Sequence, residues 1–207
     1  MNETGWKINC LGASNTEIIK SAECETIREV NYPVILGLLM RCPVRNYGKS
    51  GCNIAPAEGR ADSYLERAPQ MDKDANVVIF QGEGNDASHC LPLGEVGSTD
   101  VHTFCGAVGA VIDTLRREYP AARLIVLTGM NKLRPPKKRT DGLTHADFHR
   151  AFLAVCASRG IEPHDFTLDP EIQPDRPEMM PDGLHMSEKA CRRYAEIVRD
   201  LILRGEQ

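Results

Sequence analysis

Hydrophobic residues are distributed along the chain in two alternating patterns, short continuous runs and longer stretches with helical spacing. The short runs predict five strands, at residues 7–11, 44–47, 75–81, 123–128 and, most weakly, 161–167. The third run contains Val-Val-Ile-Phe, which is typical of a strand that is buried on both faces.

The longer stretches predict helices at residues 34–40, 101–119, 141–159 and 187–203. Their ends carry common signals, with Pro33 in a first turn, Gly160 after a last turn, and Ser187 as an N-cap. Because helices separate most of the predicted strands, the pattern indicates a parallel sheet with helices on both faces. This is an α/β fold with three α/β/α layers.

Composition and charge narrow the class of protein. The chain has 207 residues, 42% hydrophobic and 26% charged, as expected for one globular domain spanning residues 1–207. The formal net charge of -4 argues against nucleic acid or an anionic membrane surface as a partner. No apolar run is long enough to cross a bilayer, and residues 1–7 lack the features of a secretory signal. We therefore expect a cytoplasmic protein.

The eight cysteines are interpreted as reduced thiols. Cys10 and Cys156 lie within apolar runs, where a free cysteine packs as a small hydrophobic residue. The sequence contains no Cys-x-x-Cys pair, and a chain of this length does not depend on disulfides for its stability.

Side chains suited to catalysis follow two of the predicted strands and precede the last helix. Ser14 comes just after the first strand, Asn85 follows the third, and Asp182 lies three residues before His185. Because the carboxyl ends of parallel strands meet at one edge of a sheet, Ser14 and Asn85 are expected at a common site. A serine, an amide donor and an aspartate–histidine pair are the groups that nucleophilic acyl transfer uses. The sequence therefore predicts an ester hydrolase.

Four sequence blocks occur in a specific order along the chain. They are Leu-Gly-Ala-Ser-Asn-Thr at residues 11–16, Asn-Tyr-Gly-Lys-Ser-Gly at 46–51, Gly-Asn-Asp at 84–86 and Asp-Gly-Leu-His at 182–185. With these blocks the chain resembles the SGNH, or GDSL-like, hydrolases over nearly its whole length. The resemblance implies a flavodoxin-like parallel sheet of five strands and a serine esterase that works through an acyl-enzyme.

The resemblance also implies a role for each site residue. Ser14 would be the nucleophile, His185 the base that takes its proton, and Asp182 the group that orients the imidazole. The backbone N–H groups of Ser14 and Gly51 and the side chain of Asn85 would form the oxyanion hole. This chemistry requires no metal and no cofactor.

Two positions depart from the family pattern. Ala13 stands where the family usually has aspartate, and Glu83 stands where glycine is frequent. Because the residue at position 13 does not react, we expect altered local hydrogen bonding there and retained chemistry. A carboxylate facing the oxyanion hole would disfavour negative charge, so Glu83 is expected to point away from it or to contact substrate.

Family members act on several kinds of acyl ester. The sequence contains no broad apolar surface helix that could serve as a lid, which favours short acyl groups such as acetyl on a carbohydrate. Two alternatives remain open: a thioesterase or lysophospholipase with the same catalytic residues, and a non-catalytic binding module on this fold. The expected partner is a small-molecule or carbohydrate ester, and the oligomeric state is left open.

Three further features have structural interpretations. His145 and His149 have the spacing of a zinc-binding pair on a helix, but no third ligand is evident, so a solvated helix face is expected. The basic loop at residues 134–139 is expected to be a solvated connection, with steering of anionic substrates as the alternative. Asp86 is expected to fix the loop that holds Asn85.

Overall fold

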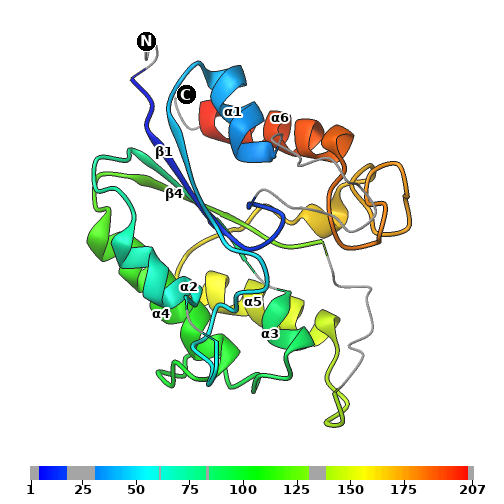
Figure 1. Ribbon diagram of the computed structural model, residues 1–207. Helices are drawn as coiled ribbons and strands as arrows, with labels where there is room; N and C mark the ends of the chain where they lie inside the picture. The colour runs from blue at the N-terminus through cyan, green and yellow to red at the C-terminus, as the bar shows by residue number, and fades with distance from the viewer. Residues whose placement is uncertain (1–4, 18–30, 61, 83, 131–138, 205–207) are drawn as a thin grey trace.

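Parallel strands form a sheet between two layers of helices (Figure 1). The computed structural model describes residues 5–17, 31–60, 62–82, 84–130 and 139–204. Within these residues the sheet has four strands, β1 (Ile8–Gly12), β2 (Val44–Gly48), β3 (Val77–Gln81) and β4 (Arg123–Leu127). Their order across the sheet is β2-β1-β3-β4, and each neighbouring pair is parallel. This order agrees with the flavodoxin-like arrangement that the resemblance implies.

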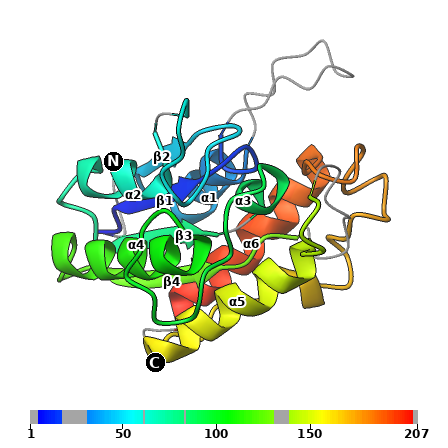
Figure 2. The same cartoon turned by 90° about the horizontal axis from the view of Figure 1, so that it is seen from below.

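Helices cover both faces of the sheet, which confirms the predicted three layers (Figures 1 and 2). One face carries α1 (Tyr32–Met40) and α6 (Glu188–Arg204), which pack against each other. The other face carries α2 (Tyr64–Arg67), α4 (Phe104–Glu118) and α5 (His145–Ser158). Within the described part of the chain, no helix combines the length and apolarity needed to cross a lipid bilayer.

The alternation of side chains along the central strands creates two separate hydrophobic cores. All five residues of β1 and all five of β3 are buried. Ile8 and Ile79 belong to the core under α1 and α6, whereas Leu11 and Phe80 belong to the core under α4 and α5. Successive strand residues point to opposite faces, so a continuous apolar run fills both cores.

Capping residues decide where the helices begin. The side chain of Asn31 accepts a hydrogen bond from the N–H of Val34, and α1 begins at Tyr32, two residues before the predicted start. Thr103 and Thr144 cap α4 and α5, which therefore begin three and four residues after their predicted starts. Ser187 accepts from the N–H of Ala190 at 3.2 Å, which confirms it as the N-cap of α6.

The prediction of a fifth strand at residues 161–167 is wrong. Only His164 pairs with β4, through backbone hydrogen bonds to Val126 and Thr128 of 2.9 and 3.0 Å. The preceding Pro163 has no N–H to donate to a strand ladder. Just beyond His164, the side chain of Asp165 accepts from the N–H of Thr167 and turns the chain into a 3₁₀ helix, Phe166–Leu168.

The predicted packing of the cysteines is confirmed at both positions singled out from the sequence. Cys10 and Cys156 have no exposed surface and lie in opposite cores. Burial raises the pKa of the Cys10 thiol to about 12, which keeps it protonated at neutral pH. Cys10 therefore serves the core as a small apolar side chain.

Candidate active site

The carboxyl ends of three strands bring separate segments of the chain to one edge of the sheet. Because β1 and β2 are in register, Gly12 at the end of β1 lies beside Gly48 at the end of β2. Ser14 follows in a tight turn, closed by a hydrogen bond of 3.0 Å from the N–H of Thr16 to the carbonyl of Ala13. The predicted site residues Ser14, Gly51 and Asn85 all lie beyond this edge.

Ser14, His185 and Asp182 form a continuous chain of hydrogen bonds. The Nε2 atom of His185 lies 3.1 Å from Oγ of Ser14, although 171 residues separate them in the sequence. Nδ1 of the same ring lies 2.6 Å from Oδ2 of Asp182. The side chains of His185 and Asp182 are 26% and 36% exposed, so the imidazole and the carboxylate are both accessible to solvent. The ring can therefore exchange a proton with both the hydroxyl and a bound molecule.

Asp182 is bound on both carboxylate oxygens. Oδ1 accepts from the backbone N–H groups of Leu184 and His185 at 2.9 and 2.7 Å, and Oδ2 accepts from the imidazole. Partial burial acts to raise the pKa of Asp182, but the hydrogen bonds from His185 and Leu184 outweigh it, and the pKa lies below its ordinary value. The carboxylate is therefore ionised at neutral pH and favours a proton on Nδ1, which leaves Nε2 free to accept one.

The two other predicted oxyanion donors lie on loops that contact each other. Gly51 has a φ of 72°, a conformation that favours glycine. Asn85 begins the short helix α3 (Asn85–Ser88), and its Nδ2 donates to the carbonyl of Cys52, the neighbour of Gly51, at 2.8 Å. The N–H of Lys49 donates to the carbonyl of Gly12 and joins the same loop to the turn of Ser14.

Asp86 connects the two loops from inside the protein. Its carboxylate is buried and accepts from the N–H groups of Ile54 and Ala55 at 2.8 and 3.0 Å. It thus ties α3, which carries Asn85, to the loop that carries Gly51. Burial raises the pKa of Asp86 to about 6 against the lowering effect of these hydrogen bonds.

This shift predicts a pH dependence of stability. Because the folded protein binds the Asp86 proton more tightly than the unfolded chain does, the stabilisation is fully present below pH 3.8 and is lost as the pH rises through about 6. We expect the free energy of unfolding of the wild type, minus that of Asp86→Asn, to fall by about 2 kcal/mol between pH 4 and 7. Urea unfolding of both proteins across this range measures the difference, and a constant difference would contradict the buried environment of Asp86.

Arg67 is a site residue that the sequence did not reveal. From α2 its guanidinium donates to the carbonyl of Tyr47 in β2 and, at 3.1 Å, to that of Gly12 in β1. It also lies 2.9 Å from Sγ of Cys52. Arg67 therefore supports the strand end from which Ser14 projects. These three partners are 15 to 55 residues away in the chain, so no local motif could indicate the role.

The expectation of a solvated face at His145 and His149 is wrong. Both side chains are buried, and each has its own partner. Nε2 of His145 lies 3.1 Å from Oγ of Ser88, and Nε2 of His149 lies 3.1 Å from the carboxylate of Asp165. Among the described residues, no three His, Cys, Asp or Glu side chains are arranged to hold a metal ion. These histidines join α5 to neighbouring segments.

Of the two departures from the family pattern, only Ala13 can be placed. Its side chain is partly buried and packs against the core under α4 and α5. Its carbonyl accepts from the N–H groups of Thr16 and Glu17, which form the turn of Ser14. A methyl group in place of the usual aspartate is thus accommodated by packing. Glu83 lies outside the described residues.

The end of the basic loop is buried, contrary to the expectation of a solvated connection. The side chain of Arg139 is only 2% exposed and stacks over the ring of Phe148 at 4.8 Å. Its guanidinium donates to the carbonyl of Leu91 at 3.0 Å and pairs with Asp141. Arg139 therefore anchors the chain beside α3. Residues 134–138 lie outside the described part.

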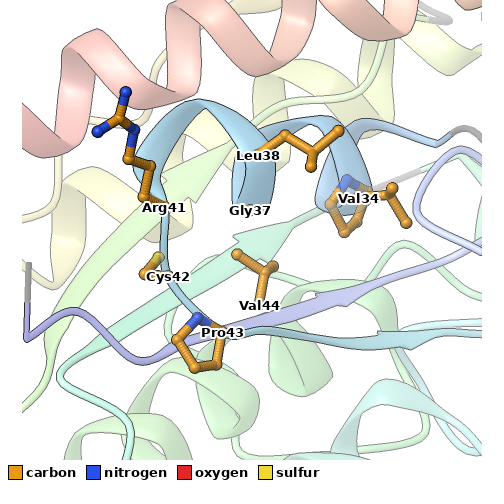
Figure 3. Close-up of a pocket in the computed structure, with 8 residues that line it drawn as sticks. Val34, Gly37, Leu38, Arg41, Cys42, Pro43 and Val44 are labelled. Carbon is orange, nitrogen blue, oxygen red and sulfur yellow. The ribbon is translucent and has the colours of Figure 1, made fainter. Parts of the chain in front are cut away.

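A separate groove lies between α1 and the start of β2 (Figure 3). Val34 and Leu38, which are 43% and 75% exposed, project beside Val44. Val44 is the first residue of β2, whereas Ser14 lies beyond the last residue of β1. Because these strands are parallel, the Val44 end of the groove is at the opposite end of the sheet from Ser14. It is not part of the candidate active site.

Comparison with known proteins gives one family and one fold. The profile of the GDSL-like Lipase/Acylhydrolase family matches residues 10–193. One crystal structure is 33% identical over 93% of this chain and 94% of that chain, with a TM-score of 0.82. A possible lipase from Chitinophaga pinensis is 18% identical over 95% and 97% of the two chains, with a TM-score of 0.70. A carbohydrate acetylesterase family member from Sinorhizobium meliloti is 14% identical over 94% and 96%, with a TM-score of 0.67.

No curated protein matches the chain. The family match nevertheless covers most of the sequence, from β1 into α6. It includes all four sequence blocks on which the resemblance was based, and the solved structures share the fold over nearly the whole chain. The predicted relationship is confirmed, and the chain belongs to the GDSL-like Lipase/Acylhydrolase family.

Proposed function

We propose that this chain is a serine ester hydrolase that works through an acyl-enzyme and acts on short acyl esters, such as acetyl groups on carbohydrates. The continuous hydrogen-bonded order Asp182–His185–Ser14 is the observation that carries the proposal. Family membership supports the hydrolysis of acyl esters as the reaction class.

In the first half of the reaction, Oγ of Ser14 attacks the carbonyl carbon of the ester. Nε2 of His185, 3.1 Å away, takes the hydroxyl proton as the new bond forms. The N–H groups of Ser14 and Gly51 and the side chain of Asn85 donate to the oxyanion. The imidazolium then gives its proton to the leaving alkoxide, and the C–O bond breaks.

In the second half, water takes the place of the departed alcohol. His185 takes a proton from the water as its oxygen bonds to the acyl carbon, and then returns a proton to Oγ of Ser14 as the acyl group leaves. Asp182 keeps the ring in one orientation and stabilises the imidazolium in both halves, because its carboxylate stays ionised. Ser14 is regenerated unchanged.

The distribution of apolar surface supports a short acyl group. The large hydrophobic side chains that are exposed within the described residues are Val34, Leu38, Val96, Leu168 and Leu203. The two that neighbour each other on one helix, Val34 and Leu38, line the groove between α1 and the start of β2. A long acyl chain needs a continuous apolar surface beside the nucleophile. The similar fold of a carbohydrate acetylesterase family member supports an acetylated sugar as the substrate class.

A fluorophosphonate probe tests the nucleophile directly. We expect the wild type to be labelled covalently and Ser14→Ala to remain unlabelled, because the probe captures an activated serine. Mass spectrometry of the labelled peptide identifies the modified residue. Labelling at another residue would refute Ser14 as the nucleophile, and a lack of labelling in both proteins would favour a non-catalytic binding module.

A panel of p-nitrophenyl esters from acetate to laurate, with acyl-thioesters and an acetylated oligosaccharide, tests the substrate class. We expect the highest kcat/KM with acetyl or propionyl esters and release of acetate from the oligosaccharide. Activity that rises with chain length would favour a lysophospholipase, and preference for the thioesters would favour a thioesterase.

A further inference from the structure

We propose that Asn15 is a positioning residue that holds His185 against Ser14 by binding the backbone on both sides of the histidine. Its Nδ2 donates to the carbonyl of Leu184 at 3.1 Å, and its Oδ1 accepts from the N–H of Met186 at 2.9 Å. A single amide side chain thus spans three consecutive residues. The central one is His185.

The chemistry of this contact suits asparagine. A carboxamide offers a donor and an acceptor side by side, which matches the carbonyl of Leu184 and the N–H of Met186. Aspartate would place a second acceptor against the carbonyl, and leucine would offer neither group. Because both peptide groups that flank His185 are held, the position of its Cα atom is set relative to the adjacent Ser14.

Several hydrogen bonds within the histidine loop give it its shape without attaching it to the turn of Ser14. Asp182 binds the N–H groups of Leu184 and His185, and Gly183 binds the carbonyl of Met180. These bonds shape the loop, but they would move with it. They therefore cannot hold the imidazole at its distance from Ser14.

The turn that carries Asn15 is itself attached to the sheet. Oγ1 of Thr16 donates to Oε1 of Gln81, at the end of β3, in a buried hydrogen bond of 2.7 Å. Nδ2 of Asn46 in β2 donates to the carbonyl of Thr16 at 2.7 Å. Asn15 thus connects the partly exposed loop of His185 to a turn that is anchored on the strands. A displacement of about 1 Å at a reacting group can lower a rate by as much as 100-fold.

The chain offers a matched control at the other end of the sheet. Asn76, which precedes β3, donates from Nδ2 to the carbonyl of Gly5 at 2.9 Å and accepts at Oδ1 from the N–H of Lys7 at 2.8 Å. The pattern is the same as that of Asn15, with a carbonyl and an N–H two residues apart. Asn76 lies at the amino ends of β1 and β3, away from Ser14.

The test compares Asn15→Leu with Asn76→Leu on a p-nitrophenyl acetate substrate. Leucine has a similar volume to asparagine and removes both hydrogen bonds. We expect Asn15→Leu to lower kcat by about 10- to 100-fold with KM changed by less than about twofold, because orientation of the base is lost. Asn76→Leu should keep kcat within about twofold of the wild type, even if its melting temperature falls as far as that of Asn15→Leu. Equal kcat values in the two variants would overturn the assignment.

A double-mutant comparison shows whether Asn15 acts through His185. The rate of phosphonylation of Ser14 is measured with a fluorophosphonate in wild-type and His185→Ala backgrounds. We expect Asn15→Leu to slow it by about 10- to 100-fold in the first and by less than about twofold in the second, since no base remains to be positioned. An equal effect in both backgrounds would show a general structural role.

Asn15→Asp is the replacement test variant if Asn15→Leu does not fold. It keeps the acceptor for the N–H of Met186 and loses the donor to Leu184, so an intermediate loss of kcat is expected; a wild-type kcat would overturn the assignment.

The assignment rests on the proposed function, and the two fail in different ways. An unlabelled wild type or an active His185→Ala refutes the proposed function. If both behave as expected while Asn15→Leu matches Asn76→Leu, only the role of Asn15 is refuted.

Discussion

Replacing His185 with alanine is expected to lower kcat for a short acyl ester by on the order of 10⁴-fold or more. Without the imidazole, no described group within hydrogen-bond distance of Oγ of Ser14 can take its proton. The hydroxyl is a weak nucleophile in its protonated form, so acylation becomes the slow step. Because the oxyanion donors are unchanged, a small residual rate above that of water is expected.

Steady-state kinetics on p-nitrophenyl acetate measures this loss, with kcat calculated from the total mass of purified protein. The ring of His185 is partly exposed, so its removal should leave the far-UV circular dichroism spectrum and the melting temperature close to those of the wild type. His102→Ala, at an exposed histidine before α4, is the matched control and should keep most of the activity. If His185→Ala retains more than about a tenth of the wild-type kcat, His185 is not the base.

Replacing Asp182 with asparagine is expected to lower kcat by about 10³- to 10⁴-fold. The carboxamide can keep its oxygen toward the N–H groups of Leu184 and His185, so the loop retains its shape. Its NH₂ group then faces Nδ1, which must become the acceptor. The ring proton moves to Nε2 and points at Ser14, where an acceptor is required.

Asp182→Ala separates two roles of the carboxylate, setting the tautomer of His185 and maintaining the shape of the loop. If the carboxylate acts by setting the tautomer, the two variants should have kcat values within about tenfold of each other. A much lower kcat in Asp182→Ala would show that the hydrogen bonds to the loop carry most of the effect. Wild-type kcat in both variants would exclude Asp182 from the reaction and require another group to orient the imidazole.

Much of the fold could be predicted from local patterns of the sequence. The continuous apolar run in β3 indicated a strand buried on both faces, and all five of its residues are buried. The hydroxyl of Ser187 marked the start of α6. The predicted fifth strand does not form. Residues 161–167 have strand-like composition, but the turn at Asp165 and the missing N–H of Pro163 restrict pairing with β4 to His164.

The candidate site was only partly visible in the sequence. Motif order indicated Ser14, Asp182 and His185, and hydrogen bonds join these three side chains. Asn15 stands next to the serine in the first block, yet its partners Leu184 and Met186 are 169 and 171 residues away. A motif describes which residue types recur, and it contains no information on which distant backbone groups they bind.

Residue order alone was sufficient for the family, the three layers and the identity of the candidate catalytic groups, because these depend on periodicity and on short motifs. Only the tertiary structure determined the distances between these groups. Packing between segments far apart in the chain decides whether the imidazole reaches the hydroxyl. It also decides whether the side chains of His145 and Arg139 are buried or exposed. The interactions that determine those distances are made by backbone carbonyls and N–H groups, which nearly every residue carries and which therefore leave no trace in the sequence.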